Sequence, residues 1–213
     1  MKQSVPIYLA SASPRRREIL SMLGLSFIAE VSEADETIDS DVPEEIVTTL
    51  AARKAMAVAE HHKNEECLVI GSDTIVWKDG QALGKPVDDE EAKGMLRSLE
   101  SNVHTVYTGV CLVRCQSGEI TKTGFADAAD VEFAPMTEEE IAWYISTGES
   151  RDKAGSYAVQ GLGARFVKAI RGDFYTVMGL PMCSLYEKLR ETGVLTNEES
   201  DKGMKEIRKA ETE

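Results

Sequence analysis

The chain has 213 residues, of which 42% are hydrophobic, and its formal net charge at pH 7 is −13. This length can bury one sizeable core, so we expect a single domain over residues 1–195 and a charged tail over residues 196–213. The negative charge disfavours binding to nucleic acid or anionic lipid. The sequence has no signal peptide, no membrane-spanning run and no disulfide or metal spacing among its four cysteines, so we expect a cytoplasmic protein with buried free thiols.

Three consecutive arginines, residues 15–17, lie where a predicted strand passes into a helix. Residues 7–10 form an apolar run typical of a buried strand, Ser13 is a candidate N-cap and Pro14 a candidate first helical residue. The arginines therefore occupy the first turn, where the helix dipole disfavours cations. A bound polyphosphate would explain them, because helix N–H groups, serine hydroxyls and guanidinium groups all bind phosphate. A solvated basic turn is the alternative.

Lys54 interrupts the apolar stripe of the clearest predicted helix, over residues 43–61. The stripe consists of Ile46, Val47, Leu50, Ala51, Ala55 and Val58. The lysine either extends to solvent or reaches a negative charge of a ligand. Between this helix and the strand predicted over residues 27–31 lies the acidic run 33–36, which is either a solvated loop or a set of metal-binding carboxylates facing the arginines.

Asp73 interrupts an apolar strand predicted over residues 67–77. A buried unpaired carboxylate is costly, so Asp73 requires a cation, a metal ion or solvent nearby, unless it simply accepts N–H bonds at a strand end. Lys85 precedes a proline and a helix predicted over residues 89–99, with Asp88 and Glu91 as a capping pair. Lys85 is a second cation at a helix start, which suggests one polyanion contacted from several sides.

The second half is predicted to be rich in strands. We expect strands over residues 105–113 and 120–133 with a turn at 116–119 and a bulge at Gly124, then a helix over 137–148 opened by a capping box. A strand is expected to lead into the glycine-rich turn at 161–163, followed by a hairpin of residues 166–170 with 174–178 and a helix from Pro181. The Gly-x-Gly at 161–163 precedes a strand, so it is no dinucleotide fingerprint. The amide of Gln160 can pair with a base edge, and the three histidines are expected at the surface.

Four segments together resemble the Maf family of nucleoside triphosphate pyrophosphatases. They are Leu9-Ala10-Ser11-Ala12-Ser13-Pro14-Arg15-Arg16, Gly71-Ser72-Asp73-Thr74, Gly84-Lys85-Pro86, and the stretch from Asp152-Lys153-Ala154-Gly155 to Gln160-Gly161-Leu162-Gly163. The resemblance covers residues 7–189. It implies an α/β fold like that of inosine triphosphate pyrophosphatases, with a mixed twisted sheet flanked by helices and two lobes around a deep cleft. It also implies a homodimer that hydrolyses the α–β phosphoanhydride with a divalent cation, Mg²⁺ or Mn²⁺.

The resemblance implies roles for individual residues. Asp73 resembles the proton acceptor, with Glu36, Lys54 and Lys85 as further catalytic residues, and Asp73 and Glu36 as metal ligands. The substrate-binding residues would be Ser11, Ser13, Arg15, Arg16, Thr74 and Gln160. Of these, Arg15, Thr74 and Gln160 resemble the specificity set of the dTTP/UTP branch, whereas the 7-methyl-GTP branch has glutamine and glutamate in place of Thr74 and Gln160. The position of Glu36 is ambiguous, because Glu33 and Asp35 are close by.

Two other functions are compatible with the sequence. A regulator of cell division could sense a nucleotide through the same residues without hydrolysing it. A nucleic-acid binder is the third hypothesis, which the net charge disfavours.

Overall fold

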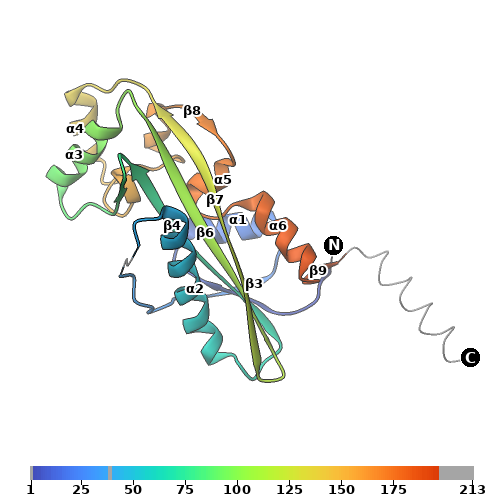
Figure 1. The fold of residues 1–213 in the computed structure, drawn as a ribbon. Helices are drawn as coiled ribbons and strands as arrows, with labels where there is room; N and C mark the ends of the chain where they lie inside the picture. Colours follow the sequence, from blue (N-terminus) through green and yellow to red (C-terminus); the bar gives the residue numbers. More distant parts are fainter. Residues whose placement is uncertain (1, 38–39, 197–213) are drawn as a thin grey trace, which may run out of the picture.

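The computed structural model describes residues 2–37 and 40–196, which form a mixed sheet flanked by helices (Figure 1). The seven strands of the main sheet follow the order β3-β2-β4-β6-β7-β8, and β5 pairs with β4. They are β2 (Ile7–Ala10), β3 (Phe27–Glu30), β4 (Cys67–Lys78), β5 (Gln81–Leu83), β6 (Val103–Gln116), β7 (Glu119–Phe133) and β8 (Val167–Arg171). β2 is parallel to β3 and β4, and the remaining pairs are antiparallel. The expected α/β class is confirmed.

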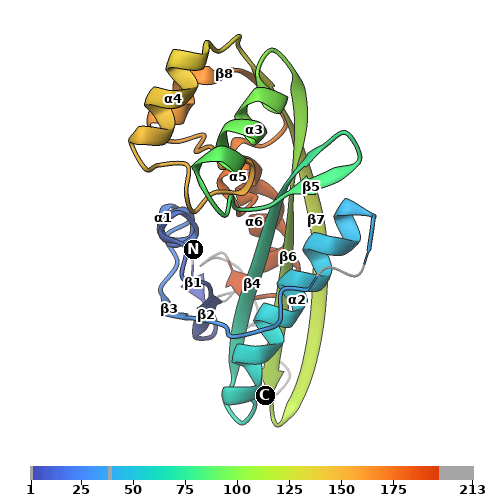
Figure 2. The ribbon, with the colours of Figure 1, turned by 90° about the vertical axis from the view of Figure 1, so that its left-hand side faces the viewer.

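The helices are distributed along the long strands (Figure 2). They are α1 (Pro14–Met22), α2 (Pro43–His61), α3 (Asp89–Leu99), α4 (Glu138–Ser146), α5 (Phe174–Met178), α6 (Met182–Glu191) and the 3₁₀ turns η1 (Ala154–Ser156) and η2 (Leu162–Phe166). α3 and α4 lie with β8 at one end of the strands, α2 extends toward the other end, and α1, α5 and α6 lie between them. None of the helices in the described ranges is long and apolar enough to cross a bilayer.

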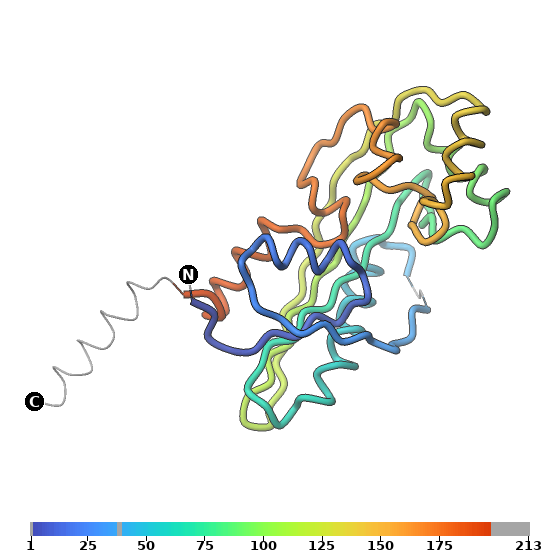
Figure 3. Tube along the Cα trace, turned by 180° about the vertical axis from the view of Figure 1, so that it is seen from behind, coloured from blue at the N-terminus to red at the C-terminus, as the bar shows by residue number. Residues whose placement is uncertain are grey.

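The two ends of the described chain lie side by side (Figure 3). β1 (Lys2–Gln3) pairs antiparallel with β9 (Leu195–Thr196) in a separate two-stranded sheet. The predicted tail began at residue 196, but Thr196 is opposite Lys2 in this sheet. The rest of the predicted tail, residues 197–213, lies outside the described residues.

Helix α2 lies against the sheet at two glycines. The predicted apolar stripe of α2 is buried, and it packs on β4 and β6 (Figure 2). A Cβ atom at Gly71 of β4 would lie 2.3 Å from the carbonyl oxygen of Ala51, and one at Gly109 of β6 would lie 2.3 Å from that of Val47. Only glycine permits this approach of helix and strand backbones. The close packing brings Lys54 of α2 to Asp73 of β4.

Two predicted strands are wrong because local φ angles or capping favour a turn or helix. Residues 152–160 contain the 3₁₀ turn η1, in which Gly155 and Ser156 have φ angles of +65° and +61° that a strand does not allow. Residues 174–178 form α5, not the second strand of a hairpin: the Asp173 carboxylate accepts a hydrogen bond from the Tyr175 N–H, and Gly179 ends the helix in the left-handed region.

Smaller predictions also require correction. No bulge occurs at Gly124, which is opposite Cys111 in an unbroken register; the irregularity in β7 lies between Glu132 and Phe133, where β8 pairs. In the capping pair of α3, Asp88 accepts the Glu91 N–H as expected, but the Glu91 carboxylate accepts the N–H of Val87 and not that of Asp88.

Burial corrects two further expectations. Cys67, Cys111 and Cys115 are free and buried as predicted, whereas Cys183 is exposed. His104 is buried, and its Nε2 lies 2.8 Å from the Tyr157 hydroxyl oxygen. Burial lowers the pKa of His104 to about 4, so it is neutral at pH 7. A histidine on a strand that is covered on both faces does not reach the surface, and the sequence pattern did not reveal that cover.

Candidate active site

The sequence-predicted residues converge where β4 extends beyond its parallel neighbour β2. The pairing of β2 with β4 ends at Ala10 opposite Gly71, and β5 begins to pair only at Val76. Between these points, residues 72–75 have no strand partner on the β2 side within the described chain. This open edge lies at the carboxyl end of β2, the position where ligands bind in open α/β sheets. We call the group Glu36, Lys54, Asp73, Arg16 and Thr74 the edge site.

Lys54 joins two carboxylates on the α2 face of β4. Its ammonium nitrogen lies 2.5 Å from Asp73 Oδ1 and 2.7 Å from Glu36 Oε1. The side chains of Lys54 and Asp73 are 14% and 12% exposed, while that of Glu36 is 62% exposed. Asp73 is therefore not an unpaired buried charge, and Lys54 does not extend to solvent. The sequence-based requirement for a cation beside Asp73 is met by a residue 19 positions earlier in the chain.

Glu36 is the member of the acidic run that reaches Lys54. Asp35 instead accepts hydrogen bonds from the N–H and the hydroxyl of Thr37, and the Arg53 guanidinium donates to the Thr37 carbonyl oxygen at 2.6 Å. These contacts hold the loop against α2. The hydrogen bond from Lys54 lowers the pKa of Glu36 despite partial burial, and the positive charges of Lys85 and Arg16 lower it further. The structure thus distinguishes Glu36 from its acidic neighbours.

Arg16 lies on the opposite face of β4. Its guanidinium donates to the carbonyl oxygen of Gly179 at 2.8 Å, to Ser11 Oγ at 3.3 Å and to Thr74 Oγ1 at 3.2 Å. These bonds tie α1, β4 and the end of α5 together, and they occupy three of the five N–H donors of the guanidinium. Burial lowers the pKa of Arg16, while the nearby Asp73 charge raises it. Because successive strand residues point to opposite faces, Asp73 and Thr74 flank the open edge from two sides.

The start of α1 keeps free N–H groups beside this edge. Ser13 occupies the N-cap position as predicted and Pro14 the first helical position, but within the described residues the Ser13 side chain makes no capping hydrogen bond. Ser11 Oγ accepts the Ser13 N–H at 3.1 Å. The first-turn N–H groups that helix geometry leaves unpaired are therefore not taken by a capping side chain. Arg15 follows in this turn and is half-buried.

Lys85 and Gln160 lie at the margin of the site. Lys85 is exposed, and its positive charge adds to that of Lys54 in lowering the pKa of Glu36. Gln160 is also exposed, and its amide nitrogen lies 3.4 Å from Glu18 Oε1 of α1. The Glu18 contact places Gln160 over the helix that carries Arg15 and Arg16. Hydrogen bonds and ion pairs between side chains thus join six of the ten predicted site residues in two groups on the two faces of β4, namely Ser11, Arg16 and Thr74, and Glu36, Lys54 and Asp73. Ser13 and Arg15 lie at the start of α1, and Lys85 and Gln160 lie outside both groups.

Sequence reasoning missed residues that hydrogen-bond to Thr74 and Arg16 of the edge site. Thr108 Oγ1 lies 2.9 Å from Thr74 Oγ1 and donates to the Thr176 carbonyl oxygen at 2.7 Å. The Gly179 carbonyl oxygen accepts hydrogen bonds from both Arg16 and Ser72. A threonine within the apolar run of β6 was the available signal for Thr108. Nothing local marked Gly179, because its role depends on a carbonyl group that every residue has.

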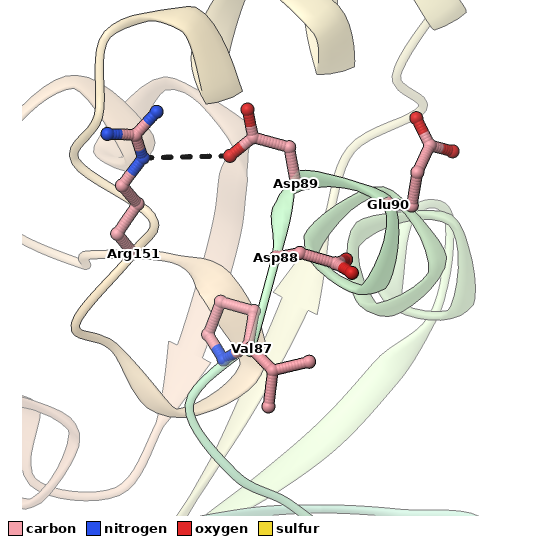
Figure 4. A pocket seen from close by; sticks show the side chains of 6 residues that line it. Val87, Asp88, Asp89, Glu90 and Arg151 are labelled. Carbon is pink, nitrogen blue, oxygen red and sulfur yellow. Dashed lines mark ion pairs between the residues drawn. The ribbon is translucent and has the colours of Figure 1, made fainter.

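A second hollow lies at the start of α3 and has the wrong charge for a phosphate. Its volume is about 590 Å³, and Figure 4 shows the carboxylates of Asp88, Asp89 and Glu90 around it, with Arg151 Nε 3.6 Å from Asp89 Oδ1. Three carboxylates against one guanidinium repel a polyanion. The edge site, with its cations, remains the candidate for a triphosphate.

The described residues offer few protein ligands for a metal ion. No group of three or more His, Cys, Asp or Glu side chains in residues 2–37 and 40–196 is arranged to hold one. Asp73 and Glu36 form a pair of carboxylates whose oxygens both contact one ammonium group. A cation that keeps part of its water shell and takes the rest of its ligands from a phosphate would need no more than such a pair.

Comparisons with known proteins identify the family of this chain. The family model described as Maf-like protein matches residues 6–192. The chain is 50% identical to a protein of Bacillus cytotoxicus named dTTP/UTP pyrophosphatase, over 86% of this chain and 93% of that one. It is 44% identical to a protein of the same name from Lachnoclostridium phytofermentans, over 88% and 95% of the two chains.

Among solved structures, the chain is similar to a nucleoside-triphosphatase / dITP/XTP pyrophosphatase from Mycobacterium abscessus. The TM-score is 0.42 at 17% identity, covering 88% of this chain and 97% of that one. The family model extends over residues 6–192, which include every residue of the edge site, and the two relatives match 86% and 88% of the chain. The chain therefore belongs to the Maf-like protein family.

Proposed function

We propose that this chain is a nucleoside triphosphate pyrophosphatase that converts dTTP and UTP to the nucleoside monophosphate and pyrophosphate. The observation that carries the proposal is the position of Asp73, a carboxylate 2.5 Å from the Lys54 ammonium at an open sheet edge. Its neighbour Thr74 contacts Arg16 on the other face of the same strand. The name of the relatives at 44–50% identity supports the choice of substrates.

The triphosphate would lie along the start of α1, with its phosphate oxygens facing the cations. The free N–H groups of the first turn and Arg15 would bind it from one side, and Lys54 and Lys85 from the other. Arg16 has most of its donors engaged, so its main task is to fix Ser11 and Thr74 while its charge attracts the phosphates. Ser13 would offer its hydroxyl, which is not used as a cap.

Asp73 would accept the proton of the attacking water. The water oxygen forms a bond to the α-phosphorus while the bond from that phosphorus to the bridging oxygen breaks, and pyrophosphate leaves with the electron pair. Such a reaction requires in-line placement of the water and neutralised phosphate oxygens rather than covalent catalysis. Asp73 faces α2 at the open edge, so it can orient a water there while Arg15 and Lys85 bind phosphates.

Asp73 and Glu36 would also hold a divalent cation, Mg²⁺ or Mn²⁺. Two carboxylates fit a cation that arrives with the triphosphate and keeps several waters, since Mg²⁺ is commonly bound this way. When bound, the cation would neutralise charge on the phosphates and activate the water. The Lys54 ammonium group lies between these carboxylates in the structure. We therefore propose that it exchanges these contacts for a contact with a phosphate oxygen when the substrate binds. Lys54 would thereby leave both carboxylates free for the cation.

Thr74, Arg15 and Gln160 would recognise the pyrimidine nucleotide. The Gln160 amide can donate one hydrogen bond and accept another, which matches the edge of uracil or thymine. Its exposure and its contact with Glu18 of α1 support this role.

The test is pyrophosphate release from dTTP and UTP with Mg²⁺, measured for the wild type, Asp73→Asn and Asp79→Asn. We expect Asp73→Asn to lose turnover while remaining folded, with a Tm lowered by the weakened bond to Lys54. Asp79→Asn should behave as wild type, because the Asp79 side chain is 74% exposed in the β4–β5 turn. Inorganic phosphate as product would show that a different bond is cut. Nucleotide binding without turnover, across nucleotides and metals, would instead favour the non-hydrolytic regulator of cell division.

The proposal also includes the assembly state and the compartment in which the enzyme acts. The enzyme would act as a homodimer in the cytoplasm on free nucleotides and not on nucleic acid, as the net charge of −13 suggests. Sedimentation of the purified chain would give the assembly state. A salt-sensitive shift with DNA would contradict the assignment to free nucleotides.

A further inference from the structure

The segment that carries Gln160 folds around a carboxylate of its own chain. Glu149 Oε1 accepts a hydrogen bond from the N–H of Leu162, and Glu149 Oε2 accepts one from the N–H of Gly163, both at 2.9 Å. Successive backbone N–H groups that converge on one anion form the kind of concavity that binds phosphate in other proteins. Here that concavity contains Glu149.

The two glycines of the Gly-x-Gly motif are required because Glu149 and Tyr144 lie close to their backbones. Gly161 has a φ of +119°, and a Cβ atom there would lie 2.3 Å from Glu149 Oε1. A Cβ at Gly163 would lie 2.7 Å from the Tyr144 hydroxyl oxygen and 2.6 Å from the Ala158 carbonyl oxygen. Any other residue would push the backbone away from Glu149 or Tyr144. The motif therefore has an intramolecular role.

Tyr144 connects the other end of the segment to the same carboxylate. Its hydroxyl donates to Glu149 Oε2 at 2.8 Å and accepts the N–H of Ala158 at 3.0 Å. Tyr144 is fully buried on α4, so the hydroxyl has little freedom. The segment is thus bound at Ala158 and again at Leu162 and Gly163, and Gln160 lies exposed between these points.

Glu149 keeps its charge in this position. Burial would raise its pKa, but the N–H groups of Leu162 and Gly163 and the Tyr144 hydroxyl outweigh this, and the pKa lies below its usual range. Hydrogen bonds to a charged acceptor are stronger than those between neutral groups. The ionised carboxylate therefore restricts the conformations open to the segment.

We propose that Glu149 and Tyr144 are positioning residues that set base selectivity by holding Gln160 in place. This inference rests on the proposed function, in which Gln160 contacts the pyrimidine. Neither residue needs to touch the substrate, since each acts through the backbone of the Gln160 segment. Pre-organisation of this kind increases discrimination, because a loosely held amide loses conformational entropy on each binding event.

The first experiment measures kcat/KM for UTP and CTP in Glu149→Gln, a variant with similar shape and no charge. We expect the UTP:CTP ratio to fall about tenfold, or about 1.4 kcal/mol. Hydrogen exchange of the Leu162 and Gly163 amides should become at least about tenfold faster, which corresponds to the same free energy. In a Gln160→Ala background, Glu149→Gln should cause no further fall in the ratio, because the two changes act through one contact.

Glu138→Gln is the matched control, since it removes an exposed carboxylate that pairs with Arg97 at the start of α4, the helix that carries Tyr144. It should change neither the ratio nor the exchange rates. If Glu149→Gln does not fold, Tyr144→Phe replaces it with the same expectations, because it removes only the hydroxyl group. An equal fall in the ratio with and without Gln160 would overturn the proposal.

The exchange measurement separates this proposal from the proposed function. A wild-type chain that hydrolyses neither UTP nor dTTP would refute the function. Unchanged exchange at Leu162 and Gly163 in Glu149→Gln would refute the positioning role even if the wild type is active.

Discussion

Replacing Lys54 with methionine removes the charge shared by Asp73 and Glu36 while keeping most of the side-chain volume. Breaking a buried ion pair costs about 3–5 kcal/mol, because the remaining charge is left without a partner. The Lys54–Asp73 bond is a buried ion pair, since the two side chains are 14% and 12% exposed. Glu36 is 62% exposed, so its bond to Lys54 contributes little more than a surface ion pair. We therefore expect Lys54→Met to lower the free energy of unfolding by about 3 kcal/mol.

Thermal unfolding with and without Mg²⁺ measures this effect and its reversal. For a chain of this size, about 3 kcal/mol corresponds to a fall in Tm of about 6–12 °C. Mg²⁺ at 100 times its dissociation constant would restore about 2.7 kcal/mol in the variant, because two carboxylates without an ammonium bind a cation more readily. The wild type should gain much less, since Lys54 already neutralises the pair. Loss of the phosphate contact should reduce turnover by about 30-fold to 1000-fold.

Lys63→Met is the control, because Lys63 is 53% exposed and pairs with Glu60 near the end of the same helix. Its Tm should change by less than about 2 °C, since an exposed pair contributes at most about 0.5 kcal/mol at this spacing. A Lys54→Met protein as stable as the wild type, or one that Mg²⁺ stabilises no more than the wild type, would refute the arrangement of charges proposed for the edge site.

Two further predictions concern packing and pH. Gly71→Ala should destabilise the fold and lower activity, because its Cβ would meet the α2 backbone. Gly94→Ala on α3 should leave the stability unchanged or raise it by up to about 1 kcal/mol, since its Cβ meets nothing within 4 Å. Equal denaturation midpoints for the two variants would contradict this packing. Burial lowers the pKa of His62, but hydrogen bonds to Glu30 and Glu65 raise it overall, and the pKa of Glu30 is lowered mainly by its bond with His62. The contribution of His62 to the free energy of unfolding is fully present below its unfolded pKa, near 6.5, and is lost as pH rises through its raised folded pKa. The contribution of Glu30 to the same free energy is lost as pH falls through its lowered folded pKa. The free energies of unfolding of wild type and His62→Asn, measured by urea denaturation, should therefore differ most at about pH 5–6, where Glu30 is ionised and His62 is protonated. A difference that grows above pH 7 would contradict this assignment.

Much of the local structure could be predicted because it depends on short-range periodicity. The apolar stripe of α2, the strand of residues 67–77 and the start of α1 at Pro14 follow from spacing and capping alone. The five-residue run 174–178 could not be assigned from periodicity, because a short apolar segment suits either a strand or a helical turn. The caps at Asp173 and Gly179 decided it.

The amino-acid sequence by itself determined which residues are the candidates for the chemistry, because charged groups that interrupt apolar segments are costly unless they have a use. Asp73 and Lys54 could both be recognised in this way. Only the tertiary structure decided that they contact each other, since that contact requires α2 to lie against β4 at Gly71. It also decided that Glu36, and not Glu33 or Asp35, is the second carboxylate, and that the Gly-x-Gly segment encloses Glu149. Each of these facts depends on groups distant in the chain, and local periodicity carries no information about which distant groups will meet.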